Sequence, residues 1–120
     1  MEIYTEQIID LAKNPLNKHE SESATHTKSG VNLTCGDHLR IYLSVNSDGT
    51  IAKASWQGEG CAISIASASI LTEELAGKTT DYLKSLSVQD ILDFLEIPSL
   101  GPARIKCASL CLETAQGAVK

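Results

Sequence analysis

Cysteines and one aspartate have the types and spacing to hold a metal ion. Cys61 follows Gly58-Glu59-Gly60 and opens a run of small residues that is typical of a helix. The backbone N–H groups and the dipole at a helix start favour an anion, so we expect a thiolate at Cys61. A thiolate is both a nucleophile and a metal ligand. The two glycines can take positive φ and leave the approach to this sulfur open. This stretch is therefore predicted to form a reactive or metal-binding site around Cys61.

Two further segments supply ligands of the same kind. In the extended run Cys35-Gly36-Asp37, residues i and i+2 point to the same side, so a thiolate and a carboxylate can converge on one ion. Cys107 lies near the start of the last predicted helix. All three cysteines stand at element boundaries, and element ends on one side of a sheet can gather residues that are distant in sequence. The steps of 26 and 46 residues are too long for a zinc finger, and no C-x-x-C redox pair is present.

Three thiolates and one carboxylate make a four-coordinate set. Zinc accepts such ligands, with Zn–S distances of about 2.3 Å. Iron in a cluster accepts them too, and Asp37 is then a harder, weaker ligand that suits a cluster which must leave again. A purely structural role as small buried side chains also stays open for the cysteines.

Other residues near these positions are secondary candidates. Cys111 lies one helical turn after Cys107 and is either an alternative ligand, a resolving thiol or a core residue. His38 is expected on the opposite side of the strand from Asp37, from which it could still swing in as a ligand. His19 and His26 fall in a polar connector, where solvated side chains are the preferred interpretation.

The composition fits one domain over residues 1–120. The net charge of −5 comes without a basic block, so neither nucleic acid nor an acidic membrane is an expected partner. The sequence has no long apolar run and no signal-peptide pattern, and we therefore expect a cytoplasmic location. A reducing cytosol argues against two disulfides among the four cysteines.

Periodicity predicts an α+β fold, in which helices pack on one face of an antiparallel three-stranded sheet. Alternating apolar residues indicate a hairpin that turns at residues 47–49. The residue range 14–30 is predicted to be a mobile connector, because it cannot bury enough apolar area to become ordered. The predicted strands are 31–34, 39–45 and 51–57, and the predicted helices are 3–13, 62–76, a short turn within 79–86, 88–95 and 103–118.

The chain resembles the IscU/SufU family, the NifU N-terminal-like proteins. The resemblance covers almost the whole sequence, and its most specific part is the Gly-Glu-Gly-Cys block with the following helix. It is carried by Tyr4-Thr5-Glu6-Gln7-Ile8-Ile9-Asp10 with Asn14-Pro15, by Cys35-Gly36-Asp37, by Gly58-Glu59-Gly60-Cys61-Ala62-Ile63-Ser64 with Ala66-Ser67-Ala68-Ser69, and by Arg104-Ile105-Lys106-Cys107-Ala108.

The resemblance implies a scaffold for iron–sulfur cluster assembly. Such proteins accept persulfide sulfur from a cysteine desulfurase, combine it with iron, and pass a labile two-iron two-sulfur (2Fe-2S) cluster to recipient apo iron–sulfur proteins. The matching ligand positions are Cys35, Asp37, Cys61 and Cys107. Cys107 is the first candidate for the persulfide acceptor, because Arg104 and Lys106 lie near it and would stabilise a thiolate. Cys35 is the competing candidate.

The sequence departs from both branches of the family. Lys106 stands where IscU proteins carry His, and Leu100-Gly101-Pro102-Ala103-Arg104 replaces the Leu-Pro-Pro-Val-Lys loop that a dedicated chaperone reads, so this chaperone is not an expected partner. The run before Cys107 is similar to SufU, yet the 46-residue step lacks the SufU insertion. Two functions therefore stay open, a non-enzymatic scaffold and a zinc-dependent sulfurtransferase. A monomer and a homo-oligomer fit the sequence equally well.

Overall fold

Strands and helices fall in separate runs along the chain, an order that confirms the predicted α+β class. The computed structural model describes residues 6–33 and 36–120. In this part of the chain the elements are α1 (Glu6–Lys13), β1 (His26–Asn32), β2 (Asp37–Val45), β3 (Ile51–Glu59), α2 (Ala62–Leu75), α3 (Thr80–Ser85), α4 (Val88–Leu95) and α5 (Pro102–Ala118).

The three strands form one antiparallel sheet in the order β1-β2-β3. Leu39, Ile41 and Leu43 of β2 alternate toward the core, which is the period-two pattern of a strand with one covered face. The β2–β3 turn is closed where Thr50 donates its backbone N–H to the Asp48 carboxylate, 2.9 Å away. Gly49 takes φ of 89° in this turn, a conformation that favours glycine. The predicted hairpin is confirmed.

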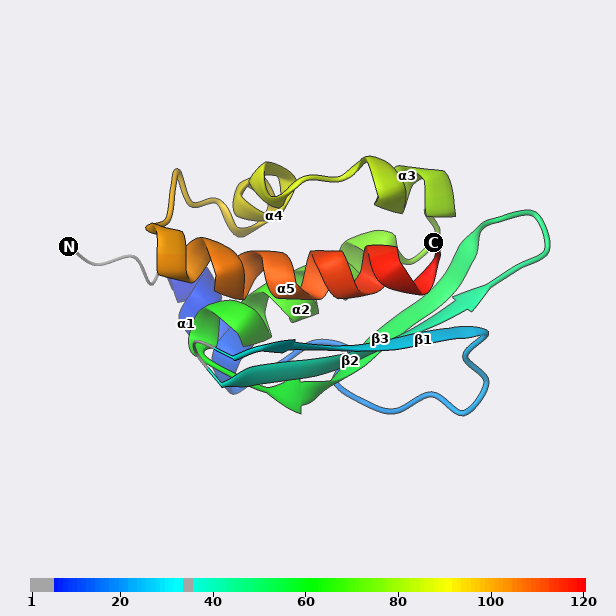
Figure 1. Ribbon diagram of the computed structural model, residues 1–120, viewed down its shortest axis with the longest axis horizontal. Helices are drawn as coiled ribbons and strands as arrows, with labels where there is room; N and C mark the ends of the chain where they lie inside the picture. Colours follow the sequence, from blue (N-terminus) through cyan, green and yellow to red (C-terminus); the bar gives the residue numbers. More distant parts are fainter. Residues whose placement is uncertain (1–5, 34–35) are drawn as a thin grey trace.

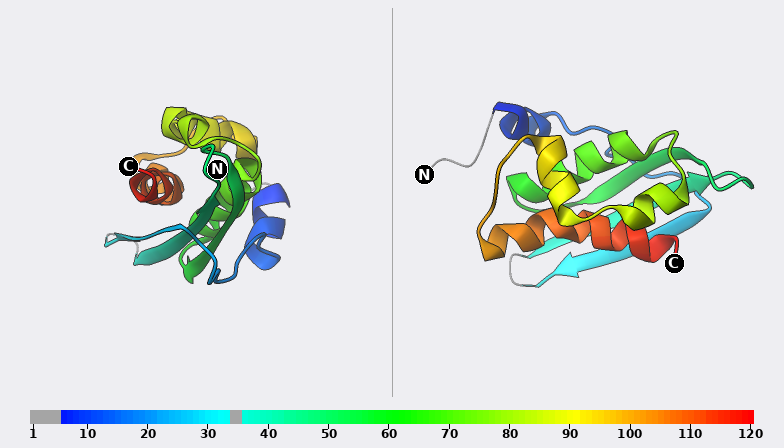
Figure 2. Two further views of the ribbon diagram at one scale, coloured as in Figure 1. Left: turned by 90° about the vertical axis from the view of Figure 1, so that its right-hand side faces the viewer. Right: turned by 90° about the horizontal axis from the view of Figure 1, so that it is seen from above.

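The helices cover one face of the sheet in two layers (Figures 1 and 2). The long helices α2 and α5 lie against the strands, α4 packs on both of them, and α1 lies against α2. Most of α2 is buried around its whole circumference, and its small residues Ala66 and Ala68 allow close approach to its neighbours. Within the described residues, no helix is both long and apolar enough to cross a bilayer.

Strand β1 begins earlier than the sequence predicted. The predicted connector 14–30 includes residues 26–30, which pair with β2, and of the predicted strand 31–34 only residues 31 and 32 belong to this longer strand, whose last residue is Asn32. The pattern of apolar residues did not reveal the start of β1, because most of its side chains are polar and its pairing with β2 is made by backbone hydrogen bonds. At Gly30 a Cβ atom would lie 2.1 Å from Thr114 Oγ1 on α5, so a glycine lets the strand approach this helix. Thr34 and residues 3–5, predicted in a strand and a helix, lie outside the described residues.

Residues 14–25 contain no helix or strand apart from a single bridge between Lys18 and Trp56. Several hydrogen bonds attach them to the domain. Trp56 donates its backbone N–H to Asn17 O and its indole N–H to Leu16 O, both at 2.9 Å, and Leu16 donates its N–H to Ser69 Oγ (3.1 Å). The mobility expected for this segment stays a prediction.

Candidate metal centre

Three of the four predicted ligands come together at one end of the molecule. Asp37 begins β2, Cys61 precedes α2, and Cys107 lies in the second turn of α5. Their ligand atoms, a carboxylate oxygen and two Sγ atoms, all lie within 4.8 Å of one another. In Figure 1 the start of β2 and the first turns of α2 and α5 lie at the same end of the fold. The geometry therefore joins residues separated by up to 70 positions in the chain.

The Asp37 carboxylate is buried, with 2% of its surface exposed, and is held by two donors. Cys61 donates its backbone N–H to Oδ1 at 3.0 Å, and Ser64 donates its hydroxyl to Oδ2 at 2.6 Å. Cys61 is the N-cap residue of α2 in an extended conformation, and its own side chain makes no capping hydrogen bond. Asp37 therefore acts as an acceptor for the start of α2 from a different element, and its negative charge is favourable at this helix end.

Glycines before Cys61 make room for this carboxylate. A Cβ atom at position 60 would lie 2.7 Å from Asp37 Oδ1 and 2.9 Å from its Cγ. Gly58 has φ of 144° and packs its Cα against the backbone of His38. The positive φ considered at both glycines occurs at Gly58, whereas Gly60 is required by the close approach of Asp37.

The donor set suits a thiophilic metal ion. Ligand atoms on one tetrahedral ion with bonds of about 2.0–2.3 Å lie roughly 3.3–3.8 Å apart, so the three side chains need shifts of only about 1 Å to share one. Cys107 is 1% exposed, whereas Cys61 is partly exposed and gives the group its contact with the surface. Cys35, the predicted fourth ligand, lies outside the described residues, and its participation stays a prediction.

The secondary candidates lie away from this group. None of His19, His26 and His38 belongs to it, and His38 is exposed between Asp37 and Leu39 on β2. Cys111 is fully buried, its Sγ lies 3.5 Å from Ala108 O of the same helix, and burial raises its pKa to about 12. This places Cys111 in the core.

Two basic residues were expected to act on Cys107. Lys106 is exposed and Arg104 is partly exposed, whereas the Cys107 side chain turns inward. Lys106 lines a cavity of about 390 Å³ between the end of β1 and α5, together with Val31, Asn32, Leu33, Ser109, Leu110 and Glu113. The effect of the two basic residues on the Cys107 thiol stays a prediction.

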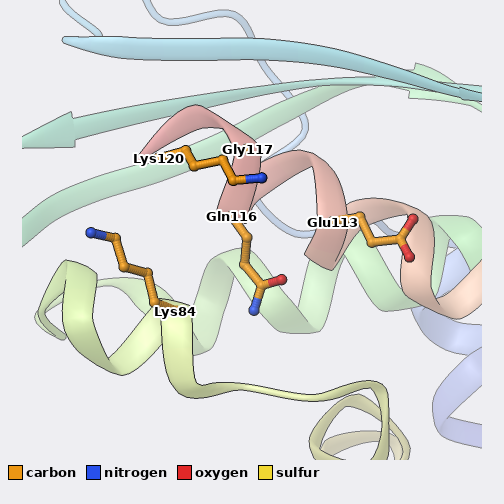
Figure 3. Close-up of a pocket in the computed structure, with 5 residues that line it drawn as sticks. All are labelled: Lys84, Glu113, Gln116, Gly117 and Lys120. Atoms are coloured by element: carbon orange, nitrogen blue, oxygen red, sulfur yellow. The ribbon is translucent and has the colours of Figure 1, made fainter.

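A separate cavity of about 520 Å³ lies near the C-terminal end of α5 (Figure 3). Its lining includes Lys84 and Lys120 but no thiol. Gln116 in its wall donates to the carbonyl oxygens of Leu83 and Leu86, at 3.1 and 2.9 Å, and so attaches α5 to the C-terminal end of α3. The group of Asp37, Cys61 and Cys107 lies at the other end of α5.

Sequence reasoning missed Ser64. Its hydroxyl makes the 2.6 Å contact with Asp37, and it is also 3.4 Å from Cys107 O and 3.8 Å from Cys61 Sγ. The sequence did contain a signal for it. Ser64 lies three residues after Cys61, at the third position of α2, where polar side chains often form hydrogen bonds at the start of a helix.

Comparison with known protein families gives one match over nearly the whole chain. The family model of the NifU-like N-terminal domain matches residues 3–120. A solved structure from Fervidobacterium islandicum AW-1, of a protein proposed as an iron–sulfur cluster assembly scaffold for the SUF system, superposes with a TM-score of 0.82 at 28% identity. The alignment covers 98% of this chain and 97% of that one. The fold and the sequence thus agree on the same group of proteins.

Two relatives carry names that describe different functions. The iron–sulfur cluster assembly scaffold protein IscU of Thermotoga maritima is 31% identical over 134 residues, covering 98% of this chain and 93% of the relative. The zinc-dependent sulfurtransferase SufU of Bacillus subtilis is 34% identical over 124 residues, covering 90% of this chain and 83% of the relative. Identity alone does not separate these two activities.

Proposed function

Because the chain belongs to the family of NifU-like N-terminal domains, we propose that it is a scaffold on which an iron–sulfur cluster is assembled and from which the cluster is passed on. The observation that carries this proposal is the group of two thiols and one carboxylate whose ligand atoms lie within 4.8 Å. The scaffold relative from Thermotoga maritima, which aligns over almost its full length, supports it.

The proposed ligands are Cys35, Asp37, Cys61 and Cys107. Thiolates bind iron strongly, and the carboxylate is the harder donor that exchanges more easily. Partly exposed Cys61 lies on the side from which iron can enter and a cluster can leave. The product would be a transient 2Fe-2S cluster delivered to recipient apo proteins.

Sulfur would come from a cysteine desulfurase as a persulfide on Cys107 or Cys35. Cys107 is buried, so acceptance there requires the first turns of α5 to move aside. Substituting each cysteine by serine and trapping the persulfide by alkylation and mass spectrometry assigns the acceptor. Sulfur that appears first on Cys61 would contradict both assignments.

A zinc-dependent sulfurtransferase is the second candidate. It is favoured by the relative from Bacillus subtilis and by Lys106, which stands where scaffolds of the IscU type carry His. In this case the same residues would hold zinc, which keeps the thiolates together, and a persulfide would be relayed without cluster assembly.

Anaerobic reconstitution separates the two functions. The protein is incubated with ferrous iron, cysteine, a cysteine desulfurase and dithiothreitol, which together with the ferrous iron supplies the electrons that reduce persulfide sulfur to sulfide. The visible spectrum is recorded before and after an apo-ferredoxin is added. A scaffold forms a coloured cluster that moves to the ferredoxin. Cys111→Ser is the matched control for Cys107→Ser, because both residues lie on α5 but only Cys107 is in the ligand group. A protein that relays persulfide and forms no transferable cluster would be a sulfurtransferase.

A further inference from the structure

We propose that Ser64 is a positioning residue that holds the Asp37 carboxylate in the orientation in which it meets a metal ion. This inference rests on the proposed function, since it takes Asp37 as a ligand. Ser64 lies in the first turn of α2 and is fully buried. It is not proposed to bind the metal itself.

The hydrogen bonds of Ser64 connect it to every described member of the ligand group. Its Oγ lies 2.6 Å from Asp37 Oδ2, 3.4 Å from Cys107 O and 3.8 Å from Cys61 Sγ. A hydroxyl has one hydrogen, which the short bond to the carboxylate takes, because an ionised acceptor makes the stronger hydrogen bond. The Ser64 oxygen can then accept a hydrogen bond from the Cys61 thiol.

This arrangement is unusual for a hydroxyl within a helix. Serine and threonine in helices commonly donate to a carbonyl one turn earlier, as Thr72 does to Ala68 O (2.8 Å) and Thr114 does to Leu110 O (2.7 Å). Ser64 instead donates to a side chain on β2. Its contact therefore serves the aspartate and not the helix that carries it.

The hydrogen bonds leave Asp37 able to bind a metal ion. Oδ1 accepts from the Cys61 backbone and Oδ2 accepts from Ser64, so each oxygen retains a lone pair. With two donors the carboxylate has one orientation, whereas removal of Ser64 would leave it free to turn about its last side-chain bond. Loss of a group that orients a ligand typically weakens metal binding by about 10- to 100-fold.

The chain contains a matched control for Ser64. Ser67 lies one turn further along α2 and is equally buried, and its hydroxyl has no hydrogen-bond partner among the described residues. Ser64→Ala and Ser67→Ala thus remove the same atom from the same helix, and only the first removes a contact with Asp37. Asp37→Asn supplies the reference for loss of the charged ligand, because its amide oxygen can still accept from the Cys61 backbone.

The test is a titration of the full-length apo protein with cobalt(II) alone, under reducing conditions. Absorption between 300 and 800 nm gives both the affinity and a signature of the ligand set, and thermal unfolding of the apo proteins is measured in parallel. We expect Ser64→Ala to weaken cobalt binding by about 10-fold and to shift its visible bands toward those of Asp37→Asn. Ser67→Ala should match the unsubstituted protein in affinity and spectrum.

Each contrary outcome overturns the proposal in a distinguishable way. If Ser64→Ala matches the unsubstituted protein while Asp37→Asn differs, Ser64 has no positioning role and the proposed function stands. If Ser64→Ala lowers thermal stability and affinity but the spectrum of bound cobalt does not change, its role is structural. If Asp37→Asn also leaves affinity and spectrum unchanged, Asp37 is not a ligand, and both this inference and the proposed ligand set are wrong.

Discussion

Two successive turns of α5 carry cysteines in very different surroundings. Cys107 and Cys111 are four residues apart and almost completely buried. The Cys107 sulfur lies within 4.8 Å of Cys61 Sγ and an Asp37 oxygen, whereas the Cys111 sulfur lies in the core, 3.5 Å from Ala108 O. Burial therefore does not separate the proposed ligand cysteine from the packing cysteine in this protein. The two cysteines differ in the polar groups that lie near their sulfur atoms.

The largest expected difference concerns the chemical reactivity of Cys111. Its pKa of about 12 leaves about one thiolate in 10⁴ molecules at pH 8, against roughly one in ten for a cysteine at the ordinary pKa of 9.0. We expect iodoacetamide to modify Cys111 of the folded protein at least about 10³ times more slowly than partly exposed Cys61. Peptide-resolved mass spectrometry over a time course measures both rates, and labelling in urea is the control. Equal rates in the folded protein would remove the distinction between the two turns of α5.

The second prediction concerns metal binding. Cys107→Ser removes a proposed ligand and should weaken cobalt(II) or zinc binding by about 100-fold or more, since even the loss of a group that only orients a ligand costs about 10- to 100-fold. Cys111→Ser should change the affinity by less than about twofold, because Cys111 is outside the ligand group. Competition with a chromophoric chelator measures both affinities. Similar losses in the two variants would mean that α5 as a whole, and not its second turn, supports the site.

The sequence alone distinguishes the role of Cys107 from that of Cys111 only in part. Spacing and element boundaries predicted that Asp37, Cys61 and Cys107 converge, because ends of elements on one side of a sheet meet. The i, i+4 spacing put Cys111 on the same helix face as Cys107 and left its role open. Its place in the core follows from how α5 packs against α2 and the sheet, which no local pattern specifies.

The same limit explains what sequence reasoning missed in the fold and the site. The hairpin of β2 and β3 and helices α2 and α5 were predictable from alternation, turn glycines and runs of small or apolar residues. The start of β1 at His26 was not, since an edge strand can be stabilised by backbone pairing alone. The hydrogen bond between Ser64 and Asp37 joins residues 27 apart in sequence and becomes visible only when β2 and α2 are placed together.

The third prediction changes the position of Asp37 in the proposed ligand group and leaves the turn of α5 that carries Cys111 intact. A Cβ atom introduced by Gly60→Ala would lie 2.7 Å from Asp37 Oδ1, so the carboxylate must shift. We expect cobalt(II) binding to weaken by about 10-fold, while Cys111 stays protected from alkylation. Gly101→Ala is the matched control, because a Cβ atom there meets no heavy atom within 4 Å and the φ of −68° is accessible to alanine. Equal cobalt affinities in the two variants would show that the position of Asp37 does not matter.

The smallest expected effect is the pH dependence of stability that arises from Cys111. Desolvation raises the pKa of its thiol from 9.0 in the unfolded chain to about 12 in the folded protein, so the folded state keeps a proton that the unfolded state loses. The resulting stabilisation is fully present below about pH 9 and is lost as the pH rises toward 12. Between pH 8.5 and 9.5 the free energy of unfolding should fall by on the order of 1 kcal/mol through this group alone.

Urea unfolding of the unsubstituted protein and of Cys111→Ser at several pH values isolates this contribution, because every other titrating group is common to both. Serine does not ionise in this range, so Cys111→Ser should lose less stability as the pH rises, and the difference between the two proteins should narrow by on the order of 1 kcal/mol over this interval. Parallel pH profiles would mean that the Cys111 thiol ionises as easily in the folded protein as in the unfolded chain. The two turns of α5 would then differ in their neighbours but not in the chemistry of their thiols.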